Sequence, residues 1–376
     1  MSTRMKIGIY ARGLSNKLGG VKEVIKLMCE TLVHQIGPED ELFIFHNLKS
    51  AFFDTPKPRV TEIMLHCGSV FFCDYVLAPR AINQRNLDVV WFPKNVIPFF
   101  IKPKTVVTVH DLAYFLPEYR AYPFMDTLYM KIMIRRSCKR ADRIVTVSHN
   151  TKSDVEKILH TSPRKIKVVH LGLDKKYRVI KDRASLQAVK EKYNLPDRFI
   201  LNTGSITPRK NLLRLLLAFN AISATDPDIY LVLTGFISYK SERENKIIHQ
   251  NPRIIKTGFV EDLDMPYLYN LAALYIYPSL YEGFGFPVLE AQACGCPVIA
   301  AHTSSIPEVG RDSVYYIRDP HRVEEIEAAM RHVLYDEGLR HQLIQKGHRN
   351  CAGFSWEKAG RDMLGILRGV STKTIN

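Results

Sequence analysis

Short apolar runs rich in β-branched residues alternate with longer amphipathic segments along most of the chain. The runs in the first half are MKIGIYA, ELFIFH, VVWFP, TVVTVH, RIVTVS and IKVVHLG; those in the second half are RFILNTG, IYLVLTG, RIIKTG, LYIYPS, PVIAA and SVYYI. Apolar strands separated by helical segments are typical of a parallel sheet covered on both faces. The pattern predicts an α/β protein.

The alternation pauses over residues 172–198, which are polar and charged and hold one short helical pattern near 184–192. A chain of 376 residues is too long for one ordinary core. We therefore expect two doubly wound, Rossmann-like domains, 1–175 and 176–355, that face each other across a deep cleft. The segment FSWEKAGRDMLGILRG predicts an amphipathic C-terminal helix within 356–376.

Composition is that of a globular protein, and no apolar run approaches the length of a membrane span. The seven cysteines have no metal-like or CxxC spacing, which favours free thiols in a reducing cytoplasm. MSTRMKIGIYARG enters a strand pattern too early for a signal peptide.

The net charge of +15 is unevenly distributed along the chain. Residues 1–180 carry 29 Lys and Arg against 16 Asp and Glu, which gives this part a net charge of +13. This excess indicates an anionic partner for the first half, although a basic surface without a partner is an alternative.

The stretch YEGFGFPVLEAQACG holds two glutamates, Glu282 and Glu290, in an apolar context. Pro287 suits the first turn of a helix and Gly295 the position after its end, so we expect a helix over 287–294. Its first amide groups would form an anion site, with Glu282 on the preceding loop and Glu290 on the first turn. Two hydroxyl acceptors beside a phosphate site fit a nucleoside diphosphate sugar. Alternatively, Glu290 caps its own helix and Glu282 is a solvated acid.

The segment YEGFGFPVLEAQACGCPVIAAHTSSIPEVG closely resembles the donor-site signature of retaining GT-B glycosyltransferases of family 4, whose core is two glutamates separated by seven residues. The similarity extends through most of the chain. It implies a GT-B fold with an acceptor-binding first domain, a donor-binding second domain and a C-terminal helix that crosses back to the first. It also implies that Glu282 lies beside the donor hexose and that Glu290 accepts from the ribose.

Other positions agree with the resemblance. LNTGSITPRKN follows the first strand of the second half and places Arg209 and Lys210 where they would stabilise the leaving diphosphate. The family often has Arg where Ser205 stands. TVVTVHDLAYF ends with His110, which the resemblance places near the reacting sugar. The catalytic candidates are His110, Glu282, Arg209 and Lys210, and the substrate-binding candidates are Gly19, Gly20, Ser205, Asn211, Gly235, Gly258, Phe259, Val260, Phe284, Gly285, Phe286, Val288 and Glu290.

The expected reaction moves a hexose from a nucleoside diphosphate sugar to a hydroxyl group. We rank UDP-glucose slightly above GDP-mannose as the donor, although no particular residue favours either. The family resemblance implies attack by the acceptor on the face that the phosphate leaves, with the phosphate taking the proton. None of the candidate site residues belongs to an acidic metal-binding motif of the DxD type, so we expect neither a metal nor another cofactor.

Residues 123–143 predict a basic amphipathic helix. Leu128, Tyr129 and Ile132 share its basic face, and Met130, Met133 and Ile134 lie opposite; the basic residues are Lys131, Arg135, Arg136, Lys139, Arg140 and Arg143. With aromatic residues in the loop 95–104, this helix favours a lipid-linked or other glycan acceptor at an anionic membrane. We expect a cytoplasmic protein, peripheral on the inner face of the membrane.

Two other classes remain open. Net charge alone would suit a nucleic-acid-binding protein, but no recognised module is present, and we expect no nucleic acid partner. An epimerase, hydrolase or phosphorylase on the same scaffold is the second alternative, since fold does not fix function.

Overall fold

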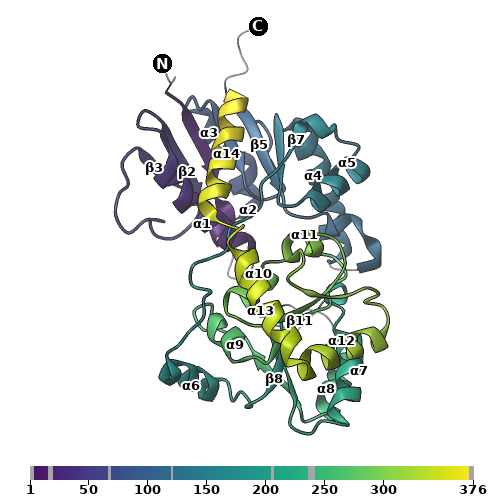
Figure 1. The fold of residues 1–376 in the computed structure, drawn as a ribbon. Coiled ribbons are helices and arrows are strands. Elements are labelled where there is room, and N and C mark those ends of the chain that lie inside the picture. Colours follow the sequence, from purple (N-terminus) through teal and green to yellow (C-terminus); the bar gives the residue numbers. More distant parts are fainter. Residues whose placement is uncertain are drawn as a thin grey trace. The chain divides into compact units, whose positions relative to one another are not determined.

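The computed structural model describes residues 4–15, 20–66, 69–119, 122–204, 207–235 and 242–371 (Figure 1). Two of the candidate residues, Gly19 and Ser205, lie outside these ranges. The chain forms two compact units. The first comprises residues 1–115, 122–172 and 355–376, and the second comprises 116–121 and 173–354.

Among the described residues of the first unit, seven parallel strands form one sheet in the order β3-β2-β1-β4-β5-β6-β7. Their bounds are β1 Lys6–Tyr10, β2 Glu41–His46, β3 Val60–Met64, β4 Val89–Phe92, β5 Lys104–Val109, β6 Arg143–Thr146 and β7 Ile166–Val168. The helices are α1 Gly20–Gln35, α2 Val70–Phe72, α3 Ala78–Asn83, α4 Phe124–Arg140, α5 His149–Leu159 and α14 Trp356–Ser371, with a π-helix, η2, at Cys73–Leu77. The order reverses between β1 and β4, which confirms a doubly wound sheet.

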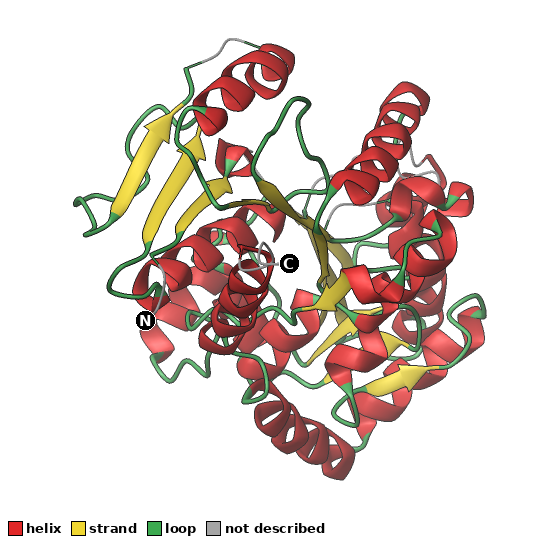
Figure 2. Ribbon diagram, turned by 90° about the horizontal axis from the view of Figure 1, so that it is seen from above, coloured by secondary structure: helices red, strands yellow, loops and turns green. Residues whose placement is uncertain are grey.

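Six parallel strands in the described part of the second unit repeat this order as β10-β9-β8-β11-β12-β13. They are β8 Phe199–Thr203, β9 Tyr230–Thr234, β10 Ile254–Gly258, β11 Leu274–Tyr277, β12 Val298–Ala301 and β13 Tyr315–Ile317. Helix α6 Arg183–Lys192 precedes β8. The helices between successive strands are α7 Leu212–Ser223, α8 Glu242–Gln250, α9 Met265–Leu271, α10 Phe286–Ala293 and α11 Ile306–Gly310, and α12 Val323–Tyr335 and α13 Glu337–Cys351 follow β13 (Figure 2). The order reverses between β8 and β11.

Every apolar run named from the sequence contains a strand, because most residues of these strands are buried in their sheets. The edge strand β3 was not predicted. Its residues are only partly buried, and Thr61 and Met64 are exposed, so the apolar signal is weak there.

The C-terminal helix α14 packs on α1 within the first unit, as the crossover prediction requires (Figure 1). Its apolar face includes Met363, Leu364 and Leu367, which are buried. Polar contacts secure both ends of the helix. The Gln35 side chain donates to the Glu357 carbonyl at 2.9 Å, and Arg368 pairs with Asp40 at 3.0 Å.

Two glycines of α14 give a matched test of this packing. A Cβ on Gly360 would lie 2.5 Å from Cγ2 of Thr31 on α1, whereas a Cβ on Gly365 would meet nothing within 4 Å. We expect Gly360→Ala to lower the free energy of unfolding by about 1–3 kcal/mol through overpacking. Gly365→Ala should raise it by about 0.5–1 kcal/mol because alanine is the better helix former. Urea unfolding of both variants measures the difference, and an equal gain in both would contradict the packing of α14 on α1.

Candidate active site

Three glycines end neighbouring strands of the second unit. Gly204 follows β8, Gly235 follows β9, and Gly258 is the last residue of β10. All three have positive φ. The Gly204 amide donates to the Thr234 carbonyl at 3.1 Å, and the Gly235 amide donates to the Gly258 carbonyl at 2.8 Å. A Cβ on Gly235 would lie 2.6 Å from the Gly204 carbonyl oxygen, so only glycine allows this close approach. Backbone therefore dominates this part of the carboxyl edge of the sheet.

Arg209 and Lys210 end a short 3-10 helix, Pro208–Lys210, between β8 and α7. Asn211 follows with φ of 60° and starts α7. Its amide nitrogen donates to the carbonyls of Pro278 and Pro320, at 3.2 and 2.7 Å, and its oxygen accepts from Arg214 at 2.9 Å. The side chain is buried and both of its amide hydrogens are used. The Asn211 side chain thus has partners within the protein, and contact of this residue with the substrate stays a prediction.

Glu282 lies buried after β11 and bridges both cations. Its Oε2 lies 2.8 Å from Nη1 of Arg209, and its Oε1 lies 2.7 Å from Nζ of Lys210. Burial would raise the pKa of Glu282, but Lys210 and Arg209 outweigh it and hold the pKa at about 2. The alternative of a solvated loop acid is wrong. Three of the catalytic candidates thus form one cluster.

Neighbouring strand ends fix the loop that carries Glu282. The Leu280 amide donates to the Arg209 carbonyl at 2.7 Å, and the Glu282 amide donates to Oγ of Ser304 at 2.8 Å. The Ser305 hydroxyl is within 2.9 Å of two carbonyls, those of Glu282 and Phe284. The sequence analysis quoted these two serines but gave them no function, although they follow β12 at the same carboxyl edge of the sheet.

Helix α10 begins one residue before the predicted position, at Phe286, and Gly285 caps it with φ of 108°. A Cβ on Gly285 would meet nothing within 4 Å, so the loop is open on that side. The Val288 amide donates to the Gly285 carbonyl at 3.1 Å. This amide therefore has an acceptor at the start of the helix, and its contact with a phosphate stays a prediction. Phe284 is buried and packs edge-on against Phe286, with ring centroids 5.1 Å apart.

Glu290 is half-buried on α10 among aromatic side chains. It accepts a hydrogen bond from the Tyr269 hydroxyl at 3.0 Å, and α10 has no side-chain cap, so it does not cap its own helix. Burial raises the pKa of Glu290 to about 7, although Tyr269 and Lys176 act in the opposite direction. Glu282 and Glu290 therefore differ in protonation near neutral pH.

The remaining second-unit candidates follow β10. The Phe259 side chain is 48% exposed, whereas Val260 is buried. Only Phe259 of the two therefore offers its side chain to a ligand.

Comparison with known proteins identifies the family of the chain. Residues 185–350 match the family described as glycosyl transferases group 1, and residues 39–177 match glycosyltransferase family 4. The O-antigen chain mannosyltransferase B of Escherichia coli is 32% identical over 260 residues, which are 68% of this chain and 67% of that protein. The chain belongs to the family 4 glycosyltransferases.

Other relatives and solved structures agree. The serotype-specific mannosyltransferase WbdA of E. coli is 31% identical over 71% of this chain, which corresponds to about a third of that protein (33%). Sucrose-phosphate synthase from Thermosynechococcus elongatus superimposes with a TM-score of 0.77 at 17% identity, covering 98% of this chain and 99% of that one. Anabaena Alr3699/HepE in complex with UDP-glucose superimposes with a TM-score of 0.75 at 16% identity, covering 97% of this chain and 100% of that one. These neighbours support a GT-B fold for the glycosyltransferase.

The first unit of the glycosyltransferase contains the fourth catalytic candidate, His110, directly after β5. Its Nε2 donates to the Pro93 carbonyl at 2.7 Å. Burial lowers the pKa of His110, so the ring is neutral and Nδ1 is left as the acceptor. Asn95 accepts from the His110 amide at 3.0 Å and orients the residue further. Gly20, the other described candidate of this unit, is exposed at the start of α1.

The helix predicted over 123–143 is α4, which ends at Arg140. Arg143 begins β6 and does not belong to its basic face, which corrects that assignment. Met133 and Ile134 are buried and Leu128 and Ile132 exposed, as predicted. No helix in the described part of the glycosyltransferase is both long and apolar enough to cross a bilayer.

The raised pKa of Glu290 predicts a pH-dependent stability. Between its unfolded pKa of about 4.3 and its folded pKa of about 7, the folded protein binds more protons, so wild-type stability falls as pH rises. We expect Glu290→Gln to be more stable than wild type by about 1–2 kcal/mol above pH 7, with the difference gone below pH 4. Urea unfolding at several pH values measures it. The exposed Glu242→Gln is the control, and a difference that does not vary with pH would contradict the burial of the carboxyl group.

Proposed function

We propose that the chain transfers mannose from GDP-mannose, with retention of configuration, to a hydroxyl group of a glycan in polysaccharide synthesis. The second unit would bind the donor and the first unit the acceptor. The relatives named as mannosyltransferases favour this donor over the UDP-glucose that the sequence analysis placed first. The observation that carries the proposal is the buried cluster of Glu282, Arg209 and Lys210.

Charge develops on the leaving diphosphate when the bond to the sugar breaks. Arg209 and Lys210 are the cations to stabilise it, and Glu282 holds both in fixed positions before the donor arrives. Preorganised charges act strongly because they need no reorientation during the reaction. A carboxylate whose pKa is about 2 is ionised at neutral pH. Glu282 therefore accepts hydrogen bonds from the donor sugar and does not serve as a general acid.

The acceptor hydroxyl oxygen would form the new bond to the anomeric carbon on the face from which the phosphate leaves. The bond between the anomeric carbon and the phosphate oxygen breaks, and the departing phosphate takes the proton of the acceptor hydroxyl. Neutral His110 would contribute Nδ1 as a hydrogen-bond acceptor for a sugar hydroxyl. Glu290, when ionised, would accept from the ribose hydroxyls.

A donor screen scored by released nucleotide tests the reaction. We expect GDP-mannose to give more released nucleotide than UDP-glucose. Lys210→Ala and Glu282→Gln should each lower kcat/KM by about 10²–10³, the first because a stabilising charge is lost and the second because the ion pairs that fix the two cations are lost. Lys256→Ala removes an exposed lysine from the same unit and is the matched control. Full activity in either cluster variant would refute its role. Binding of no nucleoside diphosphate sugar would refute the transferase, and turnover without acceptor would favour an epimerase or hydrolase.

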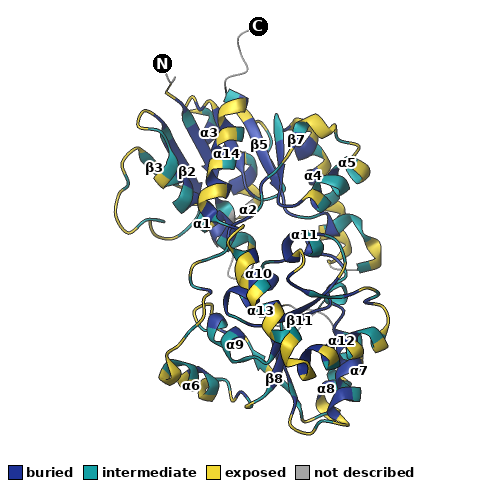
Figure 3. Cartoon of the chain, in the orientation of Figure 1, coloured by how far each residue is buried: buried dark blue, intermediate teal, exposed yellow. Residues whose placement is uncertain are grey.

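The first unit also supports the proposed association with an anionic membrane. Exposed residues of α2 and α4 are yellow in Figure 3. The exposed apolar residues of α2, η2, the β4–β5 loop and α4 are the candidates for an apolar surface: Phe71, Phe72, Val76, Phe100, Phe124, Met125, Leu128, Tyr129 and Ile132. Tyr75 joins the segments, since its ring lies 4.3 Å from that of Phe71 and 5.2 Å from that of Phe99. Its hydroxyl bonds that of Tyr129 at 2.8 Å.

Cations on α4 continue this surface toward the end of the helix. Arg135 and Lys139 are exposed on the same face as Leu128. Arg136 instead lies over the Phe99 ring at 3.5 Å and donates to the Ile97 carbonyl, which fixes the loop against α4. Apolar side chains beside lysine and arginine suit the interface of a bilayer that contains anionic lipid.

Sedimentation with vesicles tests the membrane association. We expect the wild type to bind vesicles with anionic lipid at low salt, and Phe124→Glu and Phe71→Glu each to weaken binding about tenfold or more because apolar burial is lost. Leu263→Glu, at an exposed apolar position of the second unit, should bind like the wild type. Wild-type protein that ignores anionic vesicles would end this part of the proposal.

A further inference from the structure

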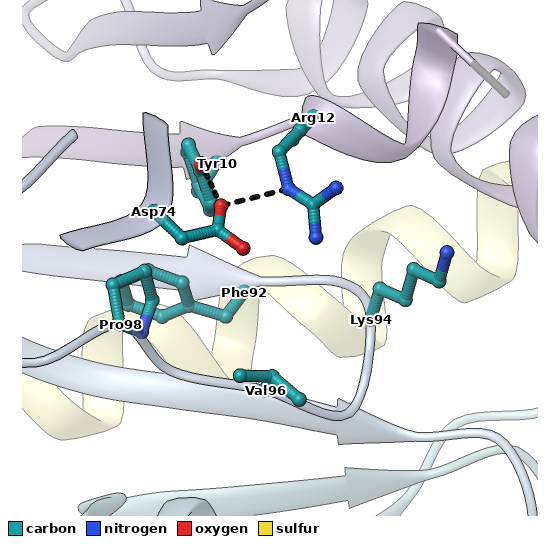
Figure 4. Close-up of a pocket in the computed structure, with 7 residues that line it drawn as sticks. All are labelled: Tyr10, Arg12, Asp74, Phe92, Lys94, Val96 and Pro98. Atoms are coloured by element: carbon teal, nitrogen blue, oxygen red, sulfur yellow. Dashed lines mark hydrogen bonds and ion pairs between the residues drawn. The ribbon is translucent and has the colours of Figure 1, made fainter. Parts of the chain in front are cut away.

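A small pocket lies at the point of the first sheet where the strand order reverses. Its polar wall comprises Tyr10 at the end of β1, Arg12, Asp74 of η2 and Lys94 after β4 (Figure 4). Ligands of doubly wound sheets bind at this position, beyond the carboxyl ends of the strands. The pocket is therefore placed where a substrate is expected.

An apolar wall completes the pocket. Phe92, Val96 and Pro98 lie below the polar groups in Figure 4. Asp74 reaches the pocket from a π-helical turn inserted between α2 and α3. Such turns are rare and occur often at functional sites. This geometry brings a carboxylate from the helix toward the end of β1.

The Asp74 carboxylate is already engaged within the protein. The Tyr10 hydroxyl donates to its Oδ1 at 2.5 Å, and Nε of Arg12 lies 2.8 Å from the same oxygen. Asp74 is buried, so its charge is opposed mainly by Arg12. The carboxylate thus offsets one of the two cations of the pocket and leaves the charge of Lys94.

Lys94 is half-buried, and its ammonium group forms no hydrogen bond or ion pair with any residue that the structure describes. Burial lowers the pKa of Lys94, and the nearby charge of Arg12 lowers it further, whereas the Asp74 carboxylate acts in the opposite direction. A desolvated ammonium group beside a second cation gains most from an anion. The ammonium group of Lys94 is therefore the group of this pocket that is best suited to bind an anion.

The backbone on both sides of Lys94 is bonded to the end of β5. The Pro93 carbonyl accepts from His110 Nε2, and the Asn95 side chain accepts from the His110 amide. The Asn95 amide donates to the Thr108 carbonyl at 2.8 Å. Lys94 is thus held next to His110 by bonds that do not involve its own side chain.

We propose that this pocket binds an anionic group of the acceptor, a phosphate or a carboxylate, with Lys94 as its principal contact and Arg12 as the second cation. The inference rests on the proposed function, in which the first unit binds the acceptor. The anionic group would anchor the acceptor beside His110, and neutral glycans would bind weakly. Lys94 is a specificity-determining residue in this scheme.

Ligand-observed nuclear magnetic resonance with the full chain tests the pocket. Saturating GDP fills the donor site, and the probes are mannose 1-phosphate, inorganic phosphate, glucuronate and the neutral methyl mannoside. We expect an anionic probe to bind the wild type, about tenfold or more weakly in Lys94→Met, and with nearly wild-type affinity in Lys94→Arg. Methyl mannoside should not respond to either change. Preference for the phosphates or for glucuronate identifies which anion the pocket takes.

The exposed Lys26→Met on α1 is the matched control and should bind every probe like the wild type. Thermal unfolding verifies that each variant is folded, and Lys94→Arg keeps the charge if Lys94→Met is unstable. Absence of binding by all anionic probes, or equal binding by Lys94→Met, would overturn the proposal. So would an equal loss of GDP affinity, because the pocket would then serve the donor. If the wild type binds no nucleoside diphosphate, the proposed function fails, and the same titrations without GDP still decide the pocket.

Discussion

The carboxylate of Glu282 is the constraint on which the second unit depends. It is buried and bridges Arg209 after β8 to Lys210, while its own backbone belongs to the loop after β11. Removing the charges of Glu282, Arg209 and Lys210 from water costs free energy, and only close pairing offsets that cost. The cluster therefore holds together strand ends that are adjacent in the sheet but about seventy residues apart in sequence. A cluster of this kind is better explained by a need for fixed charges than by stability.

The strand ends around this cluster show why the site is built from backbone. Gly235 approaches Gly204 so closely that no side chain fits between them. Ser304 and Ser305 hold the Glu282 loop through its amide and carbonyl groups. With the loop fixed in this way, the charged side chains have few alternative positions. The order of the sheet thus determines the geometry of the charges.

The sequence predicts the strands and the two-sheet organisation because parallel strands are buried on both faces and leave a continuous apolar signal. It misses β3, whose residues are partly exposed. It also identifies Glu282, Arg209 and Lys210 singly, through residue types and a family resemblance. Their pairing could not be predicted, since it depends on β8 and β11 being neighbours. The partners of the Asn211 side chain could not be predicted for the same reason, since Pro278 and Pro320 are distant in sequence.

The Lys and Arg residues that give the first half its positive net charge have different physical roles. Arg136 and Arg140 donate to carbonyls of the loop between β4 and β5, and Lys165 donates to carbonyls at the end of α4. These cations satisfy backbone acceptors and leave less of the excess for a partner. Arg135 and Lys139 remain exposed on α4, whereas Lys94 is half-buried in a small pocket. A charge count cannot separate these cases, because the difference lies in burial and in the acceptors that tertiary structure brings to each side chain.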